Sequence, residues 1–211
     1  MRALTITSLF LGTLAAASAG AIVFQDNFSS SAPGIVNDDA APGPLFTGAN
    51  FSLTAGTIDL NGPTYYTELC QGTATYCIDT TGAGGSRGQI TSDTFALAPG
   101  SYLLSFDLFG WNSFGLTETA SVNVQLGALV NQTYNTDGAV PFGGPIVIAF
   151  TVASSLPAVQ LVFTDTGTND SSAFAGAILD NIVVQAVPEP ASMFLAGGAL
   201  VCLSFLRLRK K

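Results

Sequence analysis

The chain has 211 residues, of which 48% are hydrophobic and only 9% are charged, whereas a soluble domain usually carries about a quarter charged residues. This composition excludes a cytosolic helical protein or a coiled coil, and the length fits one domain with a real hydrophobic core. Between residues 22 and 187 the single base Arg87 stands against 13 acids, a formal charge of −12. Such a region repels phosphate backbones, so nucleic acid is excluded as a partner.

The N-terminus has the pattern of a secretory signal peptide, which we place at residues 1–21. Arg2 supplies the positive charge, and an uncharged apolar segment runs from Ala3 to Ala17. Ala17-Ser18-Ala19 then offers a small-x-small site for signal peptidase, with Ala19-Gly20-Ala21 as a second option. An uncleaved anchor helix is the alternative, although the apolar run is short for a membrane span. We expect the mature chain to begin at Gly20 or Ile22.

Residues 22–186 are predicted to form one all-β domain, an antiparallel two-sheet β-sandwich. Apolar residues alternate with polar ones along several segments, whereas no segment has a convincing helical period. Turns rich in Gly, Pro, Asn and Ser separate the runs, and residues 29–44 are expected to form a long polar loop. The expected strands are Ile22–Phe28, Phe51–Leu53, Thr57–Leu60, Tyr76–Asp79, Gln89–Phe95, Tyr102–Leu108, Ser121–Leu126, Ile146–Val152, Val159–Phe163 and Ile178–Val184.

Two of the three cysteines are expected to form a disulfide. Cys70 and Cys77 are separated by six residues, in a chain that we expect to reach an oxidising compartment. The short loop limits the stabilisation to about 2–3 kcal/mol. A redox or metal pair is the alternative, but no further Cys or His is available to complete such a site. Cys202 lies in the apolar C-terminal segment and is expected to be a small buried residue.

Acidic and amide side chains in the first and last strands suggest a metal site. Jelly-roll modules commonly bring these two strands together, and here they carry Asp26, Asp180 and Asn181. Adjacent residues of a regular strand point to opposite faces, so Asp180 or Asn181 should point into the sandwich and need a partner. Oxygen ligands of this kind suit a structural Ca²⁺. Ordinary hydrogen bonds or exposure at a strand end are the alternative, and the loop 165–170 is a second cation candidate.

Three aromatic residues in predicted loops are candidates for stacking on a sugar ring. Trp111, the only tryptophan, follows the strand Tyr102–Leu108 in a Gly-rich stretch, and Tyr65 and Tyr66 lie in another loop. The alternative is that these rings close the ends of the sandwich.

The sequence argues against catalysis. No histidine occurs in the chain, which removes every mechanism that needs an imidazole. Residues 22–187 also contain no lysine, so a carboxylate pair is the only general acid–base pair left, as in glycosidases. The acids from Asp26 to Asp180 are scattered singly along the chain. We therefore predict a protein that is not an enzyme. A glycosidase that uses two carboxylates is the least favoured of the functions considered.

The C-terminus, residues 187–211, has three parts in a fixed order. Pro188, Glu189 and Pro190 come first, an apolar segment runs to Leu206, and Arg207-Leu208-Arg209-Lys210-Lys211 ends the chain. As a helix, residues 191–206 would span about 24 Å, slightly less than the ~30 Å hydrocarbon core, and the terminal basic side chains can snorkel to make up the difference. The basic cluster predicts one transmembrane helix with its end in the cytoplasm and residues 22–187 outside.

This order resembles the PEP-CTERM sorting signal of bacterial surface proteins. The resemblance implies that an exosortase-type membrane transpeptidase cuts at or near Pro188-Glu189-Pro190 and transfers the chain to a surface carrier. It also implies an inner-membrane-anchored precursor that is then delivered to the cell surface or the extracellular matrix. The segments FTGANFSLTAGTIDLNG, SDTFALAPGSYLLSFDLFG and GAILDNIVV make residues 22–186 similar to the carbohydrate-binding-module-like jelly rolls that often precede such tails.

Two functions compete on these observations. The first is a non-enzymatic, surface-sorted protein of the bacterial envelope or exopolysaccharide matrix. The second is a carbohydrate-binding module with a structural calcium ion, in which case an exopolysaccharide is a further partner.

Overall fold

A computed structural model describes residues 20–28, 43–45, 49–61, 70, 76–82, 86–110, 112–113, 116–117, 120–136, 145–167 and 176–188. The chain divides into one compact unit, Ala21–Val187, and a second unit made of Met1–Gly20 and Pro188–Lys211. The fold described below is that of Ala21–Val187. The predicted signal peptide lies outside the described residues except for its last two, and so do Glu189 and Pro190. No helix that could span a membrane occurs in the described part of the chain, and residues 191–206 lie outside it.

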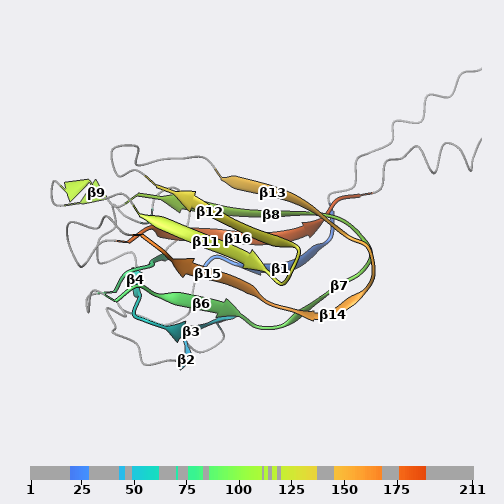
Figure 1. Cartoon of the computed structure of the whole chain (residues 1–211), viewed down its shortest axis with the longest axis horizontal. Helices are drawn as coiled ribbons and strands as arrows, with labels where there is room; N and C mark the ends of the chain where they lie inside the picture. Colours follow the sequence, from blue (N-terminus) through green and yellow to red (C-terminus); the bar gives the residue numbers. More distant parts are fainter. Residues whose placement is uncertain are drawn as a thin grey trace, which may run out of the picture. The chain divides into compact units, whose positions relative to one another are not determined.

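The first sheet is organised around the last strand, β16 (Ile178–Ala186). Its strand order is β13 (Ile146–Val152), β8 (Gly100–Phe109), β16, β5 (Cys77–Asp79) and β4 (Asp59–Asn61). A further strand, β1 (Ile22–Asp26), also pairs with β16. β8 lies along one edge of β16 and β1 along the other (Figure 1). β5 pairs with the start of that second edge, before β1. All of these pairs are antiparallel.

The second sheet packs against the first. Its order is β12 (Val130–Asn135), β11 (Ser121–Leu126), β15 (Leu161–Asp165), β6 (Gln89–Ser92), β3 (Phe51–Ala55) and β2 (Gly43–Pro44), again antiparallel throughout. Two short two-stranded sheets complete the described strands: β7 (Phe95–Leu97) with β14 (Leu156–Val159), and β9 (Asn112–Ser113) with β10 (Leu116–Thr117). The predicted all-β architecture with two main antiparallel sheets is confirmed.

The core forms where the alternating apolar residues of the two sheets meet. Leu104 and Phe106 of β8 are fully buried, as are Val122 and Val124 of β11. Phe106 packs edge-on against Phe163 of β15 with ring centroids 5.2 Å apart. Because each buried Phe, Leu or Val stabilises the fold by about 1.5–3 kcal/mol, this apolar alternation positions both sheets.

Two predicted strands are each divided between sheets. The run 89–95 becomes β6 and β7, and the run 159–163 contains the end of β14 and the start of β15. Both runs change sheet at the same corner, where Leu161 N donates to Ser92 Oγ at 2.8 Å and Gln160 Nε2 donates to Ser92 O at 3.0 Å. The buried hydroxyl of Ser92 therefore fixes a bend that alternation alone does not reveal.

A β-bulge in β16 changes which residues face the core. The register shifts between Asp180 and Val183, and Asn181 has a φ of 50°, a conformation that Asn tolerates better than most residues. As a result Leu179 and Ile182 both join the main core, although they are three residues apart. Asp180 therefore lies on the face opposite to Ile182, whereas regular alternation places the two on one face.

Candidate functional site

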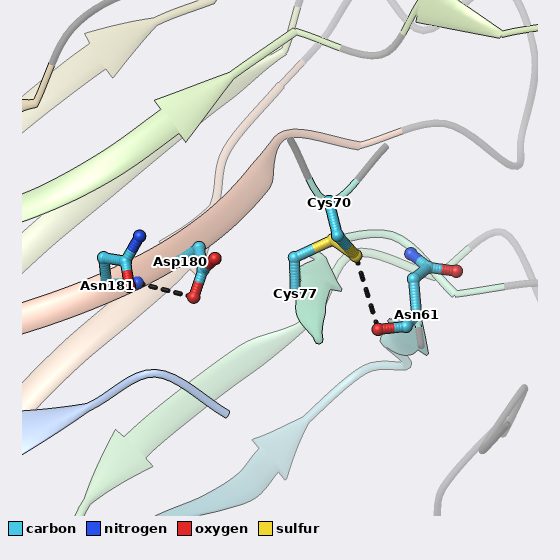
Figure 2. The surroundings of a disulfide bond; sticks show 5 residues. All are labelled: Asn61, Cys70, Cys77, Asp180 and Asn181. Atoms are coloured by element: carbon cyan, nitrogen blue, oxygen red, sulfur yellow. Dashed lines mark hydrogen bonds between the residues drawn. A yellow bond between two sulfur atoms is a disulfide. The ribbon is translucent and has the colours of Figure 1, made fainter. Parts of the chain in front are cut away.

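Asp180 lies on the outer face of the first sheet, beside the disulfide (Figure 2). Its side chain is buried, and Oδ1 accepts a 2.6 Å hydrogen bond from Asn181 N. Asp107 lies directly opposite Asp180 on β8, and Asp107 Oδ2 accepts a hydrogen bond from Asn181 Nδ2 at 2.8 Å. At the bulge, the backbone N–H of Asn181 therefore donates to Asp180 and its side-chain amide donates to Asp107.

Asp26 ties the first strand to the second sheet. Its Oδ1 accepts from Phe28 N at 2.7 Å, and its Oδ2 accepts from Asn50 N at 3.1 Å, just before β3. Asn50 Nδ2 in turn donates to Gln25 O at 3.0 Å. Both Asp26 oxygens therefore have a backbone partner, and burial raises the pKa of Asp26.

The protonation of Asp180 depends on its burial and on two neighbouring carboxylates. Burial raises the pKa of Asp180 to about 7, the Asn181 N–H opposes the rise, and the negative charges of Asp107 and Asp26 add to it. The structure thus brings Asp26, Asp180 and Asn181 into one neighbourhood. Within the described residues, no group of three His, Cys, Asp or Glu side chains has the arrangement of a metal site.

The predicted disulfide is confirmed. Cys70 and Cys77 are bonded, with their Cα atoms 5.3 Å apart. Cys77 packs with Phe109 and Ile178 in a small apolar cluster outside the main core, and Cys70 packs against that cluster. Cys70 Sγ also lies 3.4 Å from Asn61 O. The bond therefore covers the outer face of β5 beside Asp180.

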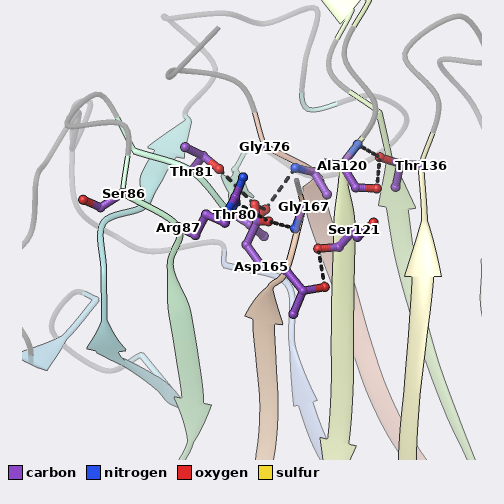
Figure 3. Close-up of polar contacts among 12 residues, drawn as sticks. Thr80, Thr81, Ser86, Arg87, Ala120, Ser121, Thr136, Asp165, Gly167 and Gly176 are labelled. Atoms are coloured by element: carbon purple, nitrogen blue, oxygen red, sulfur yellow. Dashed lines mark hydrogen bonds and ion pairs between the residues drawn. The ribbon is translucent and has the colours of Figure 1, made fainter. Parts of the chain in front are cut away.

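Asp165 connects the two sheets through buried hydrogen bonds (Figure 3). It ends β15 of the second sheet, and its Oδ2 accepts from Thr80 Oγ1 at 2.8 Å and Thr81 Oγ1 at 2.9 Å, just after β5 of the first. Its Oδ1 accepts from Gly167 N at 2.9 Å and lies 3.8 Å from Arg87 Nε. These bonds occupy both oxygens of an acid that the sequence also offered as a loop cation ligand.

Asp79 is anchored at the same end of the sandwich. Its Oδ1 accepts from Thr81 N and Gly176 N, each at 2.9 Å. A Cβ on Gly176 would lie 2.5 Å from Thr81 N, so only glycine permits this approach. The carboxylate is fully buried, yet among the described residues Oδ2 has no hydrogen-bond partner, and the same holds for the buried Nδ2 of Asn61. The sequence did not single out these two residues, because Asp79 ends the predicted strand Tyr76–Asp79 and Asn61 follows the predicted strand Thr57–Leu60.

The outer face of the second sheet is polar and uncharged. The apolar side chains of its strands point to the core, so the residues between them line the opposite face. Their side chains are hydroxyls and amides, with one valine. These outward residues are Ser52, Thr54, Gln89, Thr91, Ser121, Asn123, Gln125, Asn131, Thr133, Asn135, Val162 and Thr164.

Hydrogen bonds across the strands hold this amide–hydroxyl face in place. Asn123 Nδ2 donates to Asn131 Oδ1 at 3.0 Å and to Thr133 Oγ1 at 3.2 Å. Gln89 Nε2 donates to Thr54 Oγ1 at 3.0 Å, while Gln89 Oε1 accepts from Thr164 Oγ1 at 3.3 Å. The side chains are therefore ordered before any ligand arrives. Trp111, Tyr65 and Tyr66, the residues predicted to stack on sugars, lie outside the described residues.

Comparison with known families finds the PEP-CTERM protein-sorting motif at residues 186–210. The motif begins at the last residue of β16. No match was found among curated proteins.

Solved structures with a similar fold include carbohydrate-binding domains. The CBM22-1 xylan-binding domain of Xyn10C from Paenibacillus barcinonensis is 14% identical, with a TM-score of 0.46 over 83% of this chain and 100% of that one. The N-terminal cellulose-binding domain of Cellulomonas fimi β-1,4-glucanase C is 13% identical, with a TM-score of 0.37 over 66% and 85%. An arabinose-bound GH51 α-L-arabinofuranosidase is 12% identical, with a TM-score of 0.43 over 80% of this chain but 27% of that chain. Likeness at this level assigns no ligand.

The raised pKa of Asp180 predicts a stability that falls as pH rises. The folded-state pKa of about 7 lies above the ordinary value of 3.8, so between these two values the folded state binds more protons than the unfolded state. The unfolding free energy should then fall by up to about 1.4 kcal/mol for each pH unit in that window. Asp180→Asn should flatten the dependence, and urea unfolding at pH 5 and pH 7.5 measures it. Equal slopes for the wild type and the variant would contradict this assignment. Some slope should remain in the variant, because burial also raises the pKa values of Asp26 and Asp79.

Proposed function

We propose that this protein is exported, processed at its C-terminal motif by an exosortase-type membrane transpeptidase, and displayed at the bacterial surface or in the extracellular matrix. In this proposal the precursor is held in the inner membrane by residues 191–206 after signal peptidase has removed residues 1–21. The β-sandwich is then the delivered body and has a non-enzymatic role.

The observation that carries this proposal is the position of the sorting motif relative to the end of the fold. The PEP-CTERM motif starts at residue 186. Ala186 N donates to Ala21 O at 2.9 Å, and Val187 N donates to Ser101 O at 2.8 Å. The next residue, Pro188, is exposed. Because the last ladder is complete before the motif's prolines, cleavage there removes no strand from the sandwich.

The described acids support a non-enzymatic role. A carboxyl group with a pKa near 7 is the usual general acid of a glycosidase, and Asp180 has such a pKa. Its side chain is only 2% exposed, so a substrate has no access to it. Asp165 is held by structural hydrogen bonds through both of its oxygens.

Replacing the sorting motif should separate export from delivery. Glu189→Ala or Pro190→Ala should leave export intact but retain the protein in the inner membrane at precursor length minus the signal peptide. Cell fractionation with immunoblotting measures this, and Ser155→Ala at an exposed position serves as the control. Normal surface delivery of both motif variants would contradict the proposed processing.

A second candidate function is binding of a neutral polysaccharide, and the amide–hydroxyl face supports it. Amide and hydroxyl groups pair with sugar hydroxyls without a charge on the ligand, and their existing order lowers the entropy lost on binding. Thr133, Asn123, Thr164 and Gln89 lie in one row across four neighbouring strands, about 4.8 Å apart from strand to strand. An extended glycan along that row would meet a polar side chain at every strand. Trp111, Tyr65 and Tyr66 are proposed as additional stacking residues.

This second function predicts that the amide–hydroxyl face retains polysaccharide. Asn123→Ala and Gln89→Ala should each weaken retention about fivefold, because a lost hydrogen bond costs about 1 kcal/mol. Thr151→Ala, on the exposed side of β13, is the matched control and should bind as the wild type does. A pull-down with neutral and anionic polysaccharides, with and without calcium, makes the measurement. Equal retention by all three variants, or no retention at all, would exclude this face as the binding site.

We also propose a structural Ca²⁺ held by Asp26, Asp180 and Asn181. Their proximity supports it, and so do the negative charges of Asp107 and Asp26, which raise the pKa of Asp180, because a cation would relieve that repulsion. Asp180→Asn would remove an anionic ligand, and the calcium titration described below tests this site together with a second one.

A further inference from the structure

Two buried polar atoms without a partner lie on adjacent strands, β4 and β5, at the edge of the first sheet. In the described part of the chain these are Asp79 Oδ2 and Asn61 Nδ2, on side chains that are 0% and 3% exposed. A buried polar atom that makes no hydrogen bond costs about 1–3 kcal/mol. Native structures contain few of them, so two on adjacent strands require an explanation.

The pairing of β4 with β5 places a third polar group beside these two. Asp59 lies directly opposite Asp79, and Asn61 lies opposite Cys77. Leu60 and Ile78, the residues between them, belong to the main core, so Asp59, Asn61 and Asp79 share the outer face. Side chains directly opposite each other have Cβ atoms about 4.5–5.5 Å apart, and diagonal neighbours such as Asn61 and Asp79 are separated by at most about 7–8 Å.

The two carboxylates are held together despite their charges. Burial raises the pKa of Asp79 well above its ordinary value, and the nearby charges of Asp59 and Asp165 add to the rise. Thr81 N and Gly176 N fix one oxygen of Asp79 and thereby orient the other. Asp165 differs, because hydrogen bonds use both of its oxygens.

We propose that Asp59, Asp79 and Asn61 bind a divalent cation, Ca²⁺, on the outer face of β4 and β5. Two carboxylates balance the charge of the ion. A half-turn of the Asn61 amide replaces its unpartnered donor with a carbonyl oxygen ligand. Ca²⁺ accepts irregular sets of oxygen ligands completed by water, whereas Mg²⁺ requires near-ideal octahedral geometry. Asp59 is partly exposed, so the ion would enter from its side.

This Asp59–Asp79 site is separate from the Asp26–Asp180 site, and the two sites share no ligand. A water molecule that donates to Asp79 Oδ2 and accepts from Asn61 Nδ2 is the competing occupant. Only the cation makes the stability of this neighbourhood depend on the calcium concentration.

Calorimetric titration of the purified chain with CaCl₂ tests the proposal. Asp59→Asn should weaken calcium binding at this site by at least about tenfold, since calcium affinity depends strongly on the number of charged ligands. Asp79→Asn should do the same, but it alters a buried residue, so its folding is checked by circular dichroism and Asp59→Asn carries the test alone if it unfolds. Asp93→Asn removes an equal charge from an exposed position and should bind as the wild type does.

Asp180→Asn distinguishes the two proposed sites. If it removes one class of calcium sites and Asp59→Asn removes another, both proposals stand. If calcium binding is lost in Asp180→Asn but unchanged in Asp59→Asn, the Asp59–Asp79 site is wrong and the Asp26–Asp180 site is supported. Absence of calcium binding by the wild type overturns both and leaves water as the partner of Asp79.

Discussion

The hydrogen-bonded ladders of β16 join most of the first sheet. β8 pairs with one edge of this strand, while β5 and β1 share the other. The bulge at Asn181 lies between the residues that pair with β5 and those that pair with β1. Before the bulge this edge of β16 pairs with β5, and after it the same edge pairs with β1. The bulge also leaves Asp180 on the outer face while Ile182 and Val184 lie in the core. The position of every candidate site on the first sheet follows from this arrangement.

Buried carboxylates then connect the two sheets. Asp26 reaches from β1 to the backbone before β3, and Asp165 reaches from β15 to the threonines after β5. Each carboxylate accepts several hydrogen bonds, which compensates for the cost of burying it. In a chain with so few bases, backbone N–H groups and threonine hydroxyls take the role that salt bridges have elsewhere. This explains how a strongly acidic body can bury several acids with Arg87 as the only base between residues 22 and 187.

The sequence predicts strands well where one face is apolar and the other polar. β8, β11 and β13 follow their predicted ranges closely, since burial alone sets their register. β12 was not predicted, because VNQTYN has an apolar residue only at Val130 and Tyr134, and Asn131, Thr133 and Asn135 belong to the amide–hydroxyl face. The bulge at Asn181 is equally hidden, since it depends on one backbone angle that alternation does not encode.

The candidate sites are harder to predict because their residues are far apart in sequence. The disulfide was predictable from local spacing and compartment. The partners of Asp165 lie 84 and 85 positions away, and only the packing of the two sheets brings them together. Asp59 and Asp79 are similarly joined by the pairing of β4 with β5. Single acids scattered along the sequence thus become pairs only after folding.

The central claim is that the sandwich is complete at Val187, so that the sorting motif can be removed without loss of the fold. Urea unfolding of three chains that begin at residue 21 tests it most directly: one that ends at residue 211, in detergent, one that ends at Val187, and one that ends at Val183. The first two chains should have equal midpoints of urea unfolding. The third should lose at least about 1.5–3 kcal/mol, because it lacks buried Val184 and the last β8 pairs. If the chain ending at Val187 is clearly less stable than the longer chain, residues beyond Val187 contribute to the fold and the sandwich is not complete there.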